Sequence, residues 1–284
     1  RTPGNVLAIR PLRQGTVTDF DLTNTLLKYF TMHVIGRHFF SRPRAVISVP
    51  SGVNEVEKRS IISIMFDAGM RRTQLLDRPI AAALGAGLQF EEAYGTMIID
   101  MGAGVTDIAV LSLGQVTVSS CVPIGGDYFD DAIIRHLRKK YNLLIGERTA
   151  EELKINIGSA VARLEEIAME VTGRNLITGL PKTMKISSTE IYEALKDPIS
   201  ELIEAIQAVI ERTPPQLASD IFNDGIVFTG GAAALTGLCE AVYAVMKIPC
   251  GVADDPQTCV VMGCGRALED YSALRHLLGN GRGR

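Results

Sequence analysis

The stretch Asp100-Met-Gly102-Ala-Gly104-Val-Thr106-Asp107 decides how this sequence folds, because it joins two predicted β-strands through closely spaced glycines. Glycines at alternate positions let backbone N–H groups approach an anion that side chains would otherwise block. As a bare pattern, a glycine-rich turn is usually only a turn. The stretch therefore indicates a phosphate site only in combination with the elements around it.

The elements on either side of the glycines exclude two common phosphate-binding motifs. A dinucleotide fingerprint or a P-loop runs from a strand through glycines into a helix. Here Val105 to Leu111 continues as a β-branched strand after the apolar run Met97 to Asp100. A turn at Gly114-Gln115 leads to a further strand, Val116 to Cys121. The sequence thus predicts a three-stranded meander.

Helices and strands are expected on both sides of this meander. Upstream, Arg44 to Pro50 is typical of a strand, and two helices follow, at Val53 to Ala68 and at the alanine-rich Ala81 to Gly87, which should lie in the interior. Directly downstream, Gly125-Gly126-Asp127 opens an amphipathic helix with Asp127 as the expected N-cap.

The second half of the chain continues the alternation. The capping-box pairs Thr149 with Glu152 and Ser187 with Glu190 predict two helix starts with a polar strand-and-loop region between them. A further amphipathic helix runs from Ile199 to Ile210 and stops before Pro214 and Pro215. We then expect a strand at 225–228, a helix at 232–245, a helical end and a disordered tail from Gly279.

Composition describes a globular chain without features for nucleic acid or for spanning a membrane. Hydrophobic residues make up 46% and charged residues 21% of 284 residues, enough for one large domain or two modest ones. The net charge of -3 favours no nucleic-acid partner. The longest apolar run, Pro79 to Leu88, is about half the roughly 20 residues that cross a bilayer. Five cysteines without a CxxC pair indicate neither a disulfide framework nor a zinc site.

A hairpin with an aspartate at its entry and a polar pair at its exit resembles the phosphate loops of the actin, sugar-kinase and chaperone ATPase superfamily. The likeness narrows to the MreB family of bacterial actin relatives over nearly the whole chain. It is carried by the stretches RTPGNVLAIRPLRQG (1–15), RPRAVISVPSGVNEVEKRSI (42–61), the hairpin, IGGDYFDDAII (124–134), LIGERTAEELK (144–154), GRNLITGLP (173–181) and PPQLASDI (214–221).

The resemblance implies an α/β chain with the actin-like ATPase fold, built from duplicated RNase H-like β-meander and helix units, the first incomplete at its amino terminus. The implied division is 1–95 for the remainder of the first domain, 96–145 and 197–270 for the second, 146–196 for an inserted small subdomain and 271–284 for a tail. The family's first phosphate loop would precede Arg1, so we expect the true start to lie upstream.

For ligands, the resemblance implies ATP and Mg²⁺. The second phosphate loop would be Gly102, Ala103, Gly104, Val105 and Thr106, with Ala103 and Val105 where the family usually has glycine and threonine. Asp100 would act on the metal ion through water. Glu151, Glu152, Leu153 and Lys154 would contact ribose and adenine. Gly230, Gly231, Ala232, Ala233 and Ala234 would form the adenosine loop at a helix N-terminus.

Position 78 departs from the family, which typically has a glutamate there, directly before a proline, to orient the attacking water. Arg78 is a permanent cation and cannot accept a proton from water. Asp77 could substitute through a shifted loop, or Arg78 could stabilise charge on the γ-phosphate. The plainest interpretation is a surface arginine without a catalytic role, so hydrolysis by the family mechanism is in doubt.

Phe39 and Phe40 lie in a connection between a helix and a strand, where polar residues are usual. In the family this loop inserts into the inner face of the cytoplasmic membrane; the alternative is that both rings fold into the core. The resemblance further implies homopolymer filaments, partners in the cell-wall elongation machinery and a role in non-spherical cell shape. Two alternatives are a degenerate, non-hydrolysing scaffold and a small-molecule kinase of the same superfold.

Overall fold

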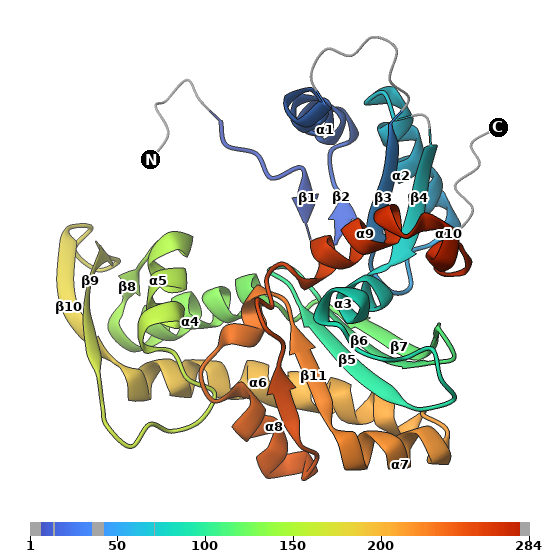
Figure 1. Ribbon diagram of the computed structural model, residues 1–284. Coiled ribbons are helices and arrows are strands. Elements are labelled where there is room, and N and C mark those ends of the chain that lie inside the picture. Colours follow the sequence, from blue (N-terminus) through green and yellow to red (C-terminus); the bar gives the residue numbers. More distant parts are fainter. Residues whose placement is uncertain (1–6, 14, 36–42, 71, 279–284) are drawn as a thin grey trace.

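The computed structural model describes residues 7–13, 15–35, 43–70 and 72–278, which form a mixed α/β structure (Figure 1). Its strands are β1 (Leu12–Arg13), β2 (Thr16–Val17), β3 (Arg44–Val49), β4 (Arg72–Asp77), β5 (Thr96–Met101), β6 (Thr106–Ser112), β7 (Gln115–Val122), β8 (Leu143–Leu144), β9 (Ala168–Asn175), β10 (Pro181–Ser187), β11 (Ile226–Thr229) and β12 (Cys250–Val252). Its helices are α1 (Phe20–Ile35), α2 (Glu55–Asp67), α3 (Arg78–Ala86), α4 (Gly126–Tyr141), α5 (Glu147–Ile157), α6 (Ser188–Glu211), α7 (Pro215–Asp224), α8 (Leu238–Met246), α9 (Cys259–Glu269) and α10 (Tyr271–Leu274), with 3₁₀ turns at Gly231–Ala234 and Arg275–Leu277.

The largest sheet in the described residues has the order β12-β11-β5-β6-β7. Strands β5, β6 and β7 pair antiparallel, which confirms the predicted meander, and β11 joins β5 in parallel. Alternate side chains of β5 enter two cores: Met97 and Ile99 pack with α4 and α6, whereas Ile98 packs with α3. Both faces are thus covered, which explains why this strand is a continuous apolar run.

Three smaller sheets surround the central one: the parallel pair β3-β4, the antiparallel order β10-β9-β8 and the short hairpin β1-β2. Helices α3 and α9 lie between the central sheet and β3-β4 (Figure 1). They approach so closely that a Cβ on Gly85 would lie 1.7 Å from the carbonyl oxygen of Cys259. The predicted interior helix is confirmed, since Ala81, Ala82 and Ala83 have no exposed surface.

Two predicted helix starts are wrong. Helix α4 has Gly125 as its N-cap and receives no cap hydrogen bond from Asp127. Its first N–H groups are satisfied by carbonyl groups of the glycine-rich hairpin, so no side-chain cap is needed. Helix α5 begins at Glu147 after Gly146, which leaves Thr149 inside the first turn. The start after Ser187 is confirmed, with the Glu190 carboxylate accepting from the Ser187 N–H at 3.1 Å.

Two other helix boundaries also differ from expectation. The helices expected after Ser187 and around Ile199 are one helix, α6, which continues through Pro198. Its apolar stripe is buried on both sides of the proline, and that burial outweighs the roughly 3 kcal/mol penalty for an interior proline. The helix expected at 232–245 is instead a 3₁₀ turn followed by α8, because Gly237 adopts a left-handed φ of 77° that interrupts the helix.

The expected domain boundaries stay predictions, and the expected tail after Gly279 lies outside the described residues. Within the residues that the structure describes, no helix combines the length and apolar character needed to cross a membrane.

Candidate nucleotide site

The hairpin between β5 and β6 makes a tight turn in which the Gly102 N–H donates to the Val105 carbonyl at 2.9 Å. This turn sets the register of the two strands, so that Met101 lies opposite Thr106 and Asp100 lies opposite Asp107. Ala103 is exposed at the tip, whereas the Val105 side chain is buried. The hairpin therefore presents its tip outward and brings two aspartates together behind it.

The tip of the hairpin rests on the start of α4. The N–H groups of Gly126 and Asp127 donate to the carbonyl oxygens of Gly102 and Ala103, at 3.0 and 2.8 Å. A Cβ on Gly125 would lie 2.4 Å from the Ala103 oxygen, so this close approach requires glycine. The glycine pair at 125–126 thus serves to hold the hairpin against the helix.

The loop after β11 lies against the entry of the hairpin. The Thr229 hydroxyl donates to the Asp100 carboxylate at 3.0 Å. Gly230 has a left-handed φ of 84°, and a Cβ there would lie 2.3 Å from the Met101 oxygen. Gly231 and Ala234 are exposed, Ala232 is half-buried and Ala233 is buried. The expected adenosine loop is therefore fixed at its start and open beyond it.

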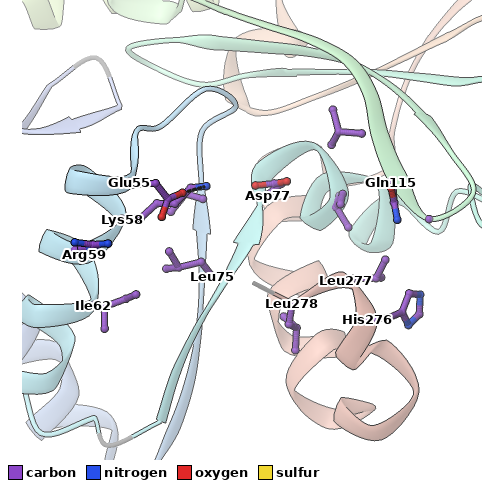
Figure 2. A pocket seen from close by; sticks show the side chains of 14 residues that line it. Glu55, Lys58, Arg59, Ile62, Leu75, Asp77, Gln115, His276, Leu277 and Leu278 are labelled. Atoms are coloured by element: carbon purple, nitrogen blue, oxygen red, sulfur yellow. Dashed lines mark hydrogen bonds and ion pairs between the residues drawn. The ribbon is translucent and has the colours of Figure 1, made fainter. Parts of the chain in front are cut away.

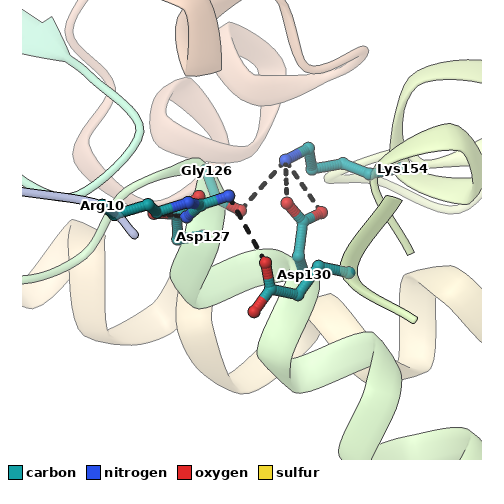
Figure 3. A network of polar contacts seen from close by, with 6 residues as sticks. Arg10, Gly126, Asp127, Asp130 and Lys154 are labelled. Carbon is teal, nitrogen blue, oxygen red and sulfur yellow. Dashed lines mark hydrogen bonds and ion pairs between the residues drawn. The ribbon is translucent and has the colours of Figure 1, made fainter. Parts of the chain in front are cut away.

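Helix α5 reaches the same place through Lys154. Its ammonium donates to the Gly126 carbonyl at 3.0 Å and to the Asp130 carboxylate at 2.9 Å (Figure 3). Burial raises the pKa of Asp130, and the Lys154 ammonium acts against that rise. The lysine therefore ties α5 to the helix start on which the hairpin rests.

The other expected ribose and adenine contacts on α5 differ in accessibility. Glu151 is exposed, Glu152 accepts a hydrogen bond from Arg148 at 3.1 Å, and the Leu153 side chain is fully buried. Of these side chains, that of Leu153 belongs to the core and not to a ligand surface.

Arg10 connects the early part of the chain to this assembly. Its guanidinium lies 3.2 Å from the Asp127 carboxylate at the start of α4 (Figure 3). It also lies 3.4 Å from the Glu147 carboxylate at the start of α5. All three side chains are at least half exposed. Such pairs contribute about 0 to 1 kcal/mol each, so this contact orients the segment more than it stabilises the fold.

The interpretation of Arg78 as a surface residue is wrong. Its guanidinium donates to the Asp107 carboxylate at 3.0 Å, and its side chain is only 18% exposed. Asp107 is fully buried and also accepts the Ser51 N–H at 2.8 Å. Arg78 is the first residue of α3, and this position aims it at the hairpin. The structure therefore places a fixed cation behind the expected phosphate loop.

Asp77 does not join this group. Its side chain is exposed and lines a cavity of about 640 Å³ (Figure 2). The cavity lies between α2, the β6–β7 turn and the segment at 276–278, and neither Thr229 nor Gly126 lines it. It is lined by Val49, Glu55, Lys58, Arg59, Ile62, Leu75, Asp77, Ile80, Gly114, Gln115, Val116, His276, Leu277 and Leu278. A substitution of Asp77 for the family glutamate finds no support in this geometry.

The electrostatics of the hairpin are those of buried acids beside one cation. Burial raises the pKa of Asp100 and of Asp107 above the ordinary value, and the Arg78 guanidinium opposes both rises. Burial and the neighbouring Asp107 charge raise the pKa of Cys121 to about 12, which keeps its thiol protonated. Cys121 is therefore no nucleophile here.

Sequence reasoning missed Asp107, Ser51 and Asp130 as members of the site. Asp107 could have been found from the turn, because a tight turn at 102–105 places residues 100 and 107 opposite each other on one face. Ser51 and Asp130 reach the site through tertiary packing that leaves no local signal. Phe39 and Phe40, the expected membrane loop, lie outside the described residues.

The chain matches one known protein family over most of its length. The family model for MreB/Mbl protein matches residues 1–276. The cell shape-determining protein MreB of Escherichia coli K12 is 46% identical over 270 residues, which cover 95% of this chain and 78% of that protein. The cell shape-determining protein Mbl of Bacillus cereus is 41% identical over 274 residues, covering 96% and 82%.

Solved structures give the same result. MreB5 of Spiroplasma citri, in crystal structures bound to ADP and to AMPPNP, superposes with a TM-score of 0.91 at 32% identity, covering 98% of this chain and 83% of that one. A MamK double helical filament, at 18% identity and a TM-score of 0.78, shares the fold. This chain belongs to the MreB/Mbl family and has the actin-like fold that its sequence predicts.

Proposed function

We propose that this chain is an ATP-binding cytoskeletal protein that forms filaments with copies of itself at the inner face of the cytoplasmic membrane and helps to set cell shape. One observation carries the nucleotide part of this proposal. The hairpin, the loop at 229–234 and the last turn of α5 come from distant parts of the sequence and are joined by direct hydrogen bonds around Asp100 and Gly126. The similarity to MreB5 structures that hold ADP and AMPPNP supports nucleotide as the ligand.

The residues fit a nucleotide better than they fit a protein-bound metal ion. Gly231 and Ala234 are exposed in the loop that packs on the hairpin entry, and with such small side chains backbone groups can approach a phosphate or a sugar. Within the described residues, no cluster of three or more His, Cys, Asp or Glu side chains could hold a metal ion. Any Mg²⁺ that accompanies the nucleotide would therefore be carried by its phosphates, and the protein group nearest to such an ion would be Asp100, acting through water.

A loss of nucleotide affinity without a loss of stability would support this site. Gly231→Leu should weaken binding of ADP and AMPPNP, measured by calorimetry, because a Cβ at Gly231 has room within the protein but a larger side chain projects into the open space. Gly251→Leu is the matched control, since a Cβ at Gly251 on β12 meets no atom within 4 Å. Equal nucleotide affinities of the two variants would show that the nucleotide does not bind against this loop.

We propose further that hydrolysis is slow, which favours the scaffold alternative. Water attack on a phosphate needs a carboxylate or similar group free to orient the water. Asp107 is paired with Arg78 and Ser51, and Asp100 accepts the Thr229 hydroxyl. Phosphate release from ATP by the polymerised protein would measure this directly, and rapid turnover that follows nucleotide binding would contradict it.

Filament formation, membrane attachment and contact with the cell-wall elongation machinery rest on the family. The relatives are named as cell shape-determining proteins, and the MamK structure is a filament of the same fold. Polymerisation is tested by sedimentation and electron microscopy with and without ATP. Attachment through Phe39 and Phe40 is tested with liposomes, as described below.

A further inference from the structure

The two aspartates of the hairpin form an acidic pair that the fold cannot separate. Asp100 and Asp107 lie opposite each other on neighbouring antiparallel strands. Both residues are buried, with 4% and 0% of their surface exposed. Side chains at such positions lie about 4.5 to 5.5 Å apart at Cβ, and like charges placed there destabilise a sheet. Two buried carboxylates in contact range need a cation between them or a proton on one of them.

Arg78 is the cation that meets this pair. It bonds directly to Asp107 at 3.0 Å, and its positive charge acts on Asp100 as well, opposing the effect of burial on both carboxyl groups. An arginine remains charged at every pH at which the protein is folded. One guanidinium therefore reduces the net charge of the group from -2 to -1 without a metal ion.

The arginine is held in place by the backbone that carries it. Arg78 opens α3, and Pro79 fixes the next backbone angle. Helix α3 packs against α9 at two places that leave no room for a Cβ: a Cβ on Gly85 would lie 1.7 Å from the Cys259 oxygen, and a Cβ on Gly263 would lie 1.8 Å from the Ala81 oxygen. The Cα of Arg78 therefore cannot withdraw from the hairpin unless the α3–α9 pair comes apart.

The guanidinium also retains capacity for a ligand. It carries five N–H donors, of which the structure directs one to Asp107, and its planar geometry suits phosphate oxygens. A divalent ion in the same position would have to share the two carboxylates with this permanent positive charge. The arrangement fits an arginine-bound phosphate better than a metal-bound one.

We propose that Arg78 takes the place of a divalent cation at the acidic pair, so that this protein binds adenine nucleotides without requiring Mg²⁺. The inference rests on the proposed nucleotide site and specifies how that site handles charge. Phosphates of ADP or ATP contact the guanidinium, which simultaneously screens Asp107 and Asp100 from them. Nucleotide binding is then insensitive to removal of divalent cations.

The test measures binding of ADP and AMPPNP by calorimetry, once with excess Mg²⁺ and once with excess EDTA. For the wild-type protein we expect dissociation constants within about threefold of each other. For Arg78→Met the affinity in EDTA should fall by about tenfold or more, since an uncompensated carboxylate pair would repel the phosphates. Arg78→Lys keeps the charge and should keep most of the binding in EDTA.

Two further variants separate charge from folding. Arg78→Met combined with Asp107→Asn removes the cation together with its buried partner. This double variant leaves no unpaired charge at position 107, so we expect it to fold even if Arg78→Met alone does not. Its nucleotide affinity should depend on Mg²⁺ through Asp100. Arg59→Met on α2 is the matched control, because Arg59 is an exposed arginine that is not among the partners of Asp100 or Asp107, and this variant should behave as the wild-type protein does.

Each result has one meaning. Binding in Mg²⁺ that disappears in EDTA for the wild-type protein overturns this inference and leaves the nucleotide site intact. Binding in EDTA that is unchanged in Arg78→Met, or in the double variant if the single one is unfolded, overturns the role of Arg78. Absence of binding to the wild-type protein under both conditions overturns the proposed function itself.

Discussion

Removing Arg78 should destabilise the protein far more than removal of a typical arginine. Arg78→Met leaves the Asp107 carboxylate fully buried with the Ser51 N–H and the Cys121 thiol as its remaining partners. Two unit charges 3.0 Å apart interact by roughly 5 kcal/mol at an effective dielectric constant of about 20. Breaking a buried pair by removing one member costs about 3 to 5 kcal/mol, because the other charge stays behind.

The assay compares the wild-type protein with the Arg78→Met variant in urea unfolding and in thermal unfolding, both monitored by far-ultraviolet circular dichroism. A change of about 3 to 5 kcal/mol lowers the midpoint of thermal unfolding by about 6 to 20 °C for a protein of this size class. Asp107→Asn removes the buried charge and leaves Arg78 partly solvated, so it should cost less. The double variant should be more stable than the sum of the two changes predicts, by at least about 2 kcal/mol.

The control is Arg59→Met, which removes an exposed arginine and should change stability by no more than about 0.5 kcal/mol. If Arg78→Met matches that control, or if the two changes add without coupling, then Arg78 and Asp107 do not form the buried pair described above. The account of the hairpin as an acidic pair held by an arginine would then be refuted.

Three further predictions concern the glycine contact, the acid at the hairpin entry and the two phenylalanines at 39 and 40. Gly125→Ala should lower the free energy of unfolding in urea by about 1 to 3 kcal/mol, because its Cβ would lie 2.4 Å from the Ala103 oxygen. Gly146→Ala, at the open N-cap of α5, is the control and should leave it unchanged. Equal effects of the two changes would contradict the close packing of hairpin and helix. Burial raises the pKa of Asp100 above its value in the unfolded chain, so ionisation of this carboxyl group lowers the stability of the fold. The loss of stability is absent at pH below the unfolded pKa and is complete once the pH has risen through the folded pKa. Asp100→Asn, whose amide oxygen can still accept from Thr229, should therefore raise the thermal midpoint at neutral pH and not at the acidic end of a pH series; a lower midpoint at neutral pH would count against it. Changing Phe39 and Phe40 together to serine should reduce co-sedimentation with anionic liposomes, and unchanged co-sedimentation would assign both rings to the core.

Patterns with a local physical cause made the fold predictable from sequence. The β5–β6–β7 meander follows from β-branched runs separated by glycine turns, and the start of α6 follows from the capping box at Ser187. The failures have a common cause, which is tertiary contact. Asp127 is not a cap because the hairpin satisfies the first N–H groups of α4, and α6 crosses Pro198 because its stripe is buried on both sides.

The candidate site was predictable in its glycine loops and not in its charges. Gly125 and Gly230 lie so close to neighbouring backbone atoms that no other residue fits, and such positions can be recognised as glycines in the sequence. The pairing of Arg78 with Asp107 joins residues 29 positions apart through the packing of α3, and nothing local marks it. Sequence alone therefore identified an unusual arginine but not the carboxylate that holds it.

The nucleotide site is tested most directly by hydrogen exchange of the protein with and without ADP, read by mass spectrometry. We predict that nucleotide slows exchange in peptides covering 101–106, 125–128 and 229–234, where the hairpin, the start of α4 and the loop after β11 meet. Peptides covering α2 and 276–278, which line the separate cavity of about 640 Å³, should exchange at unchanged rates. Protection at that cavity without protection at the hairpin would contradict the proposed site.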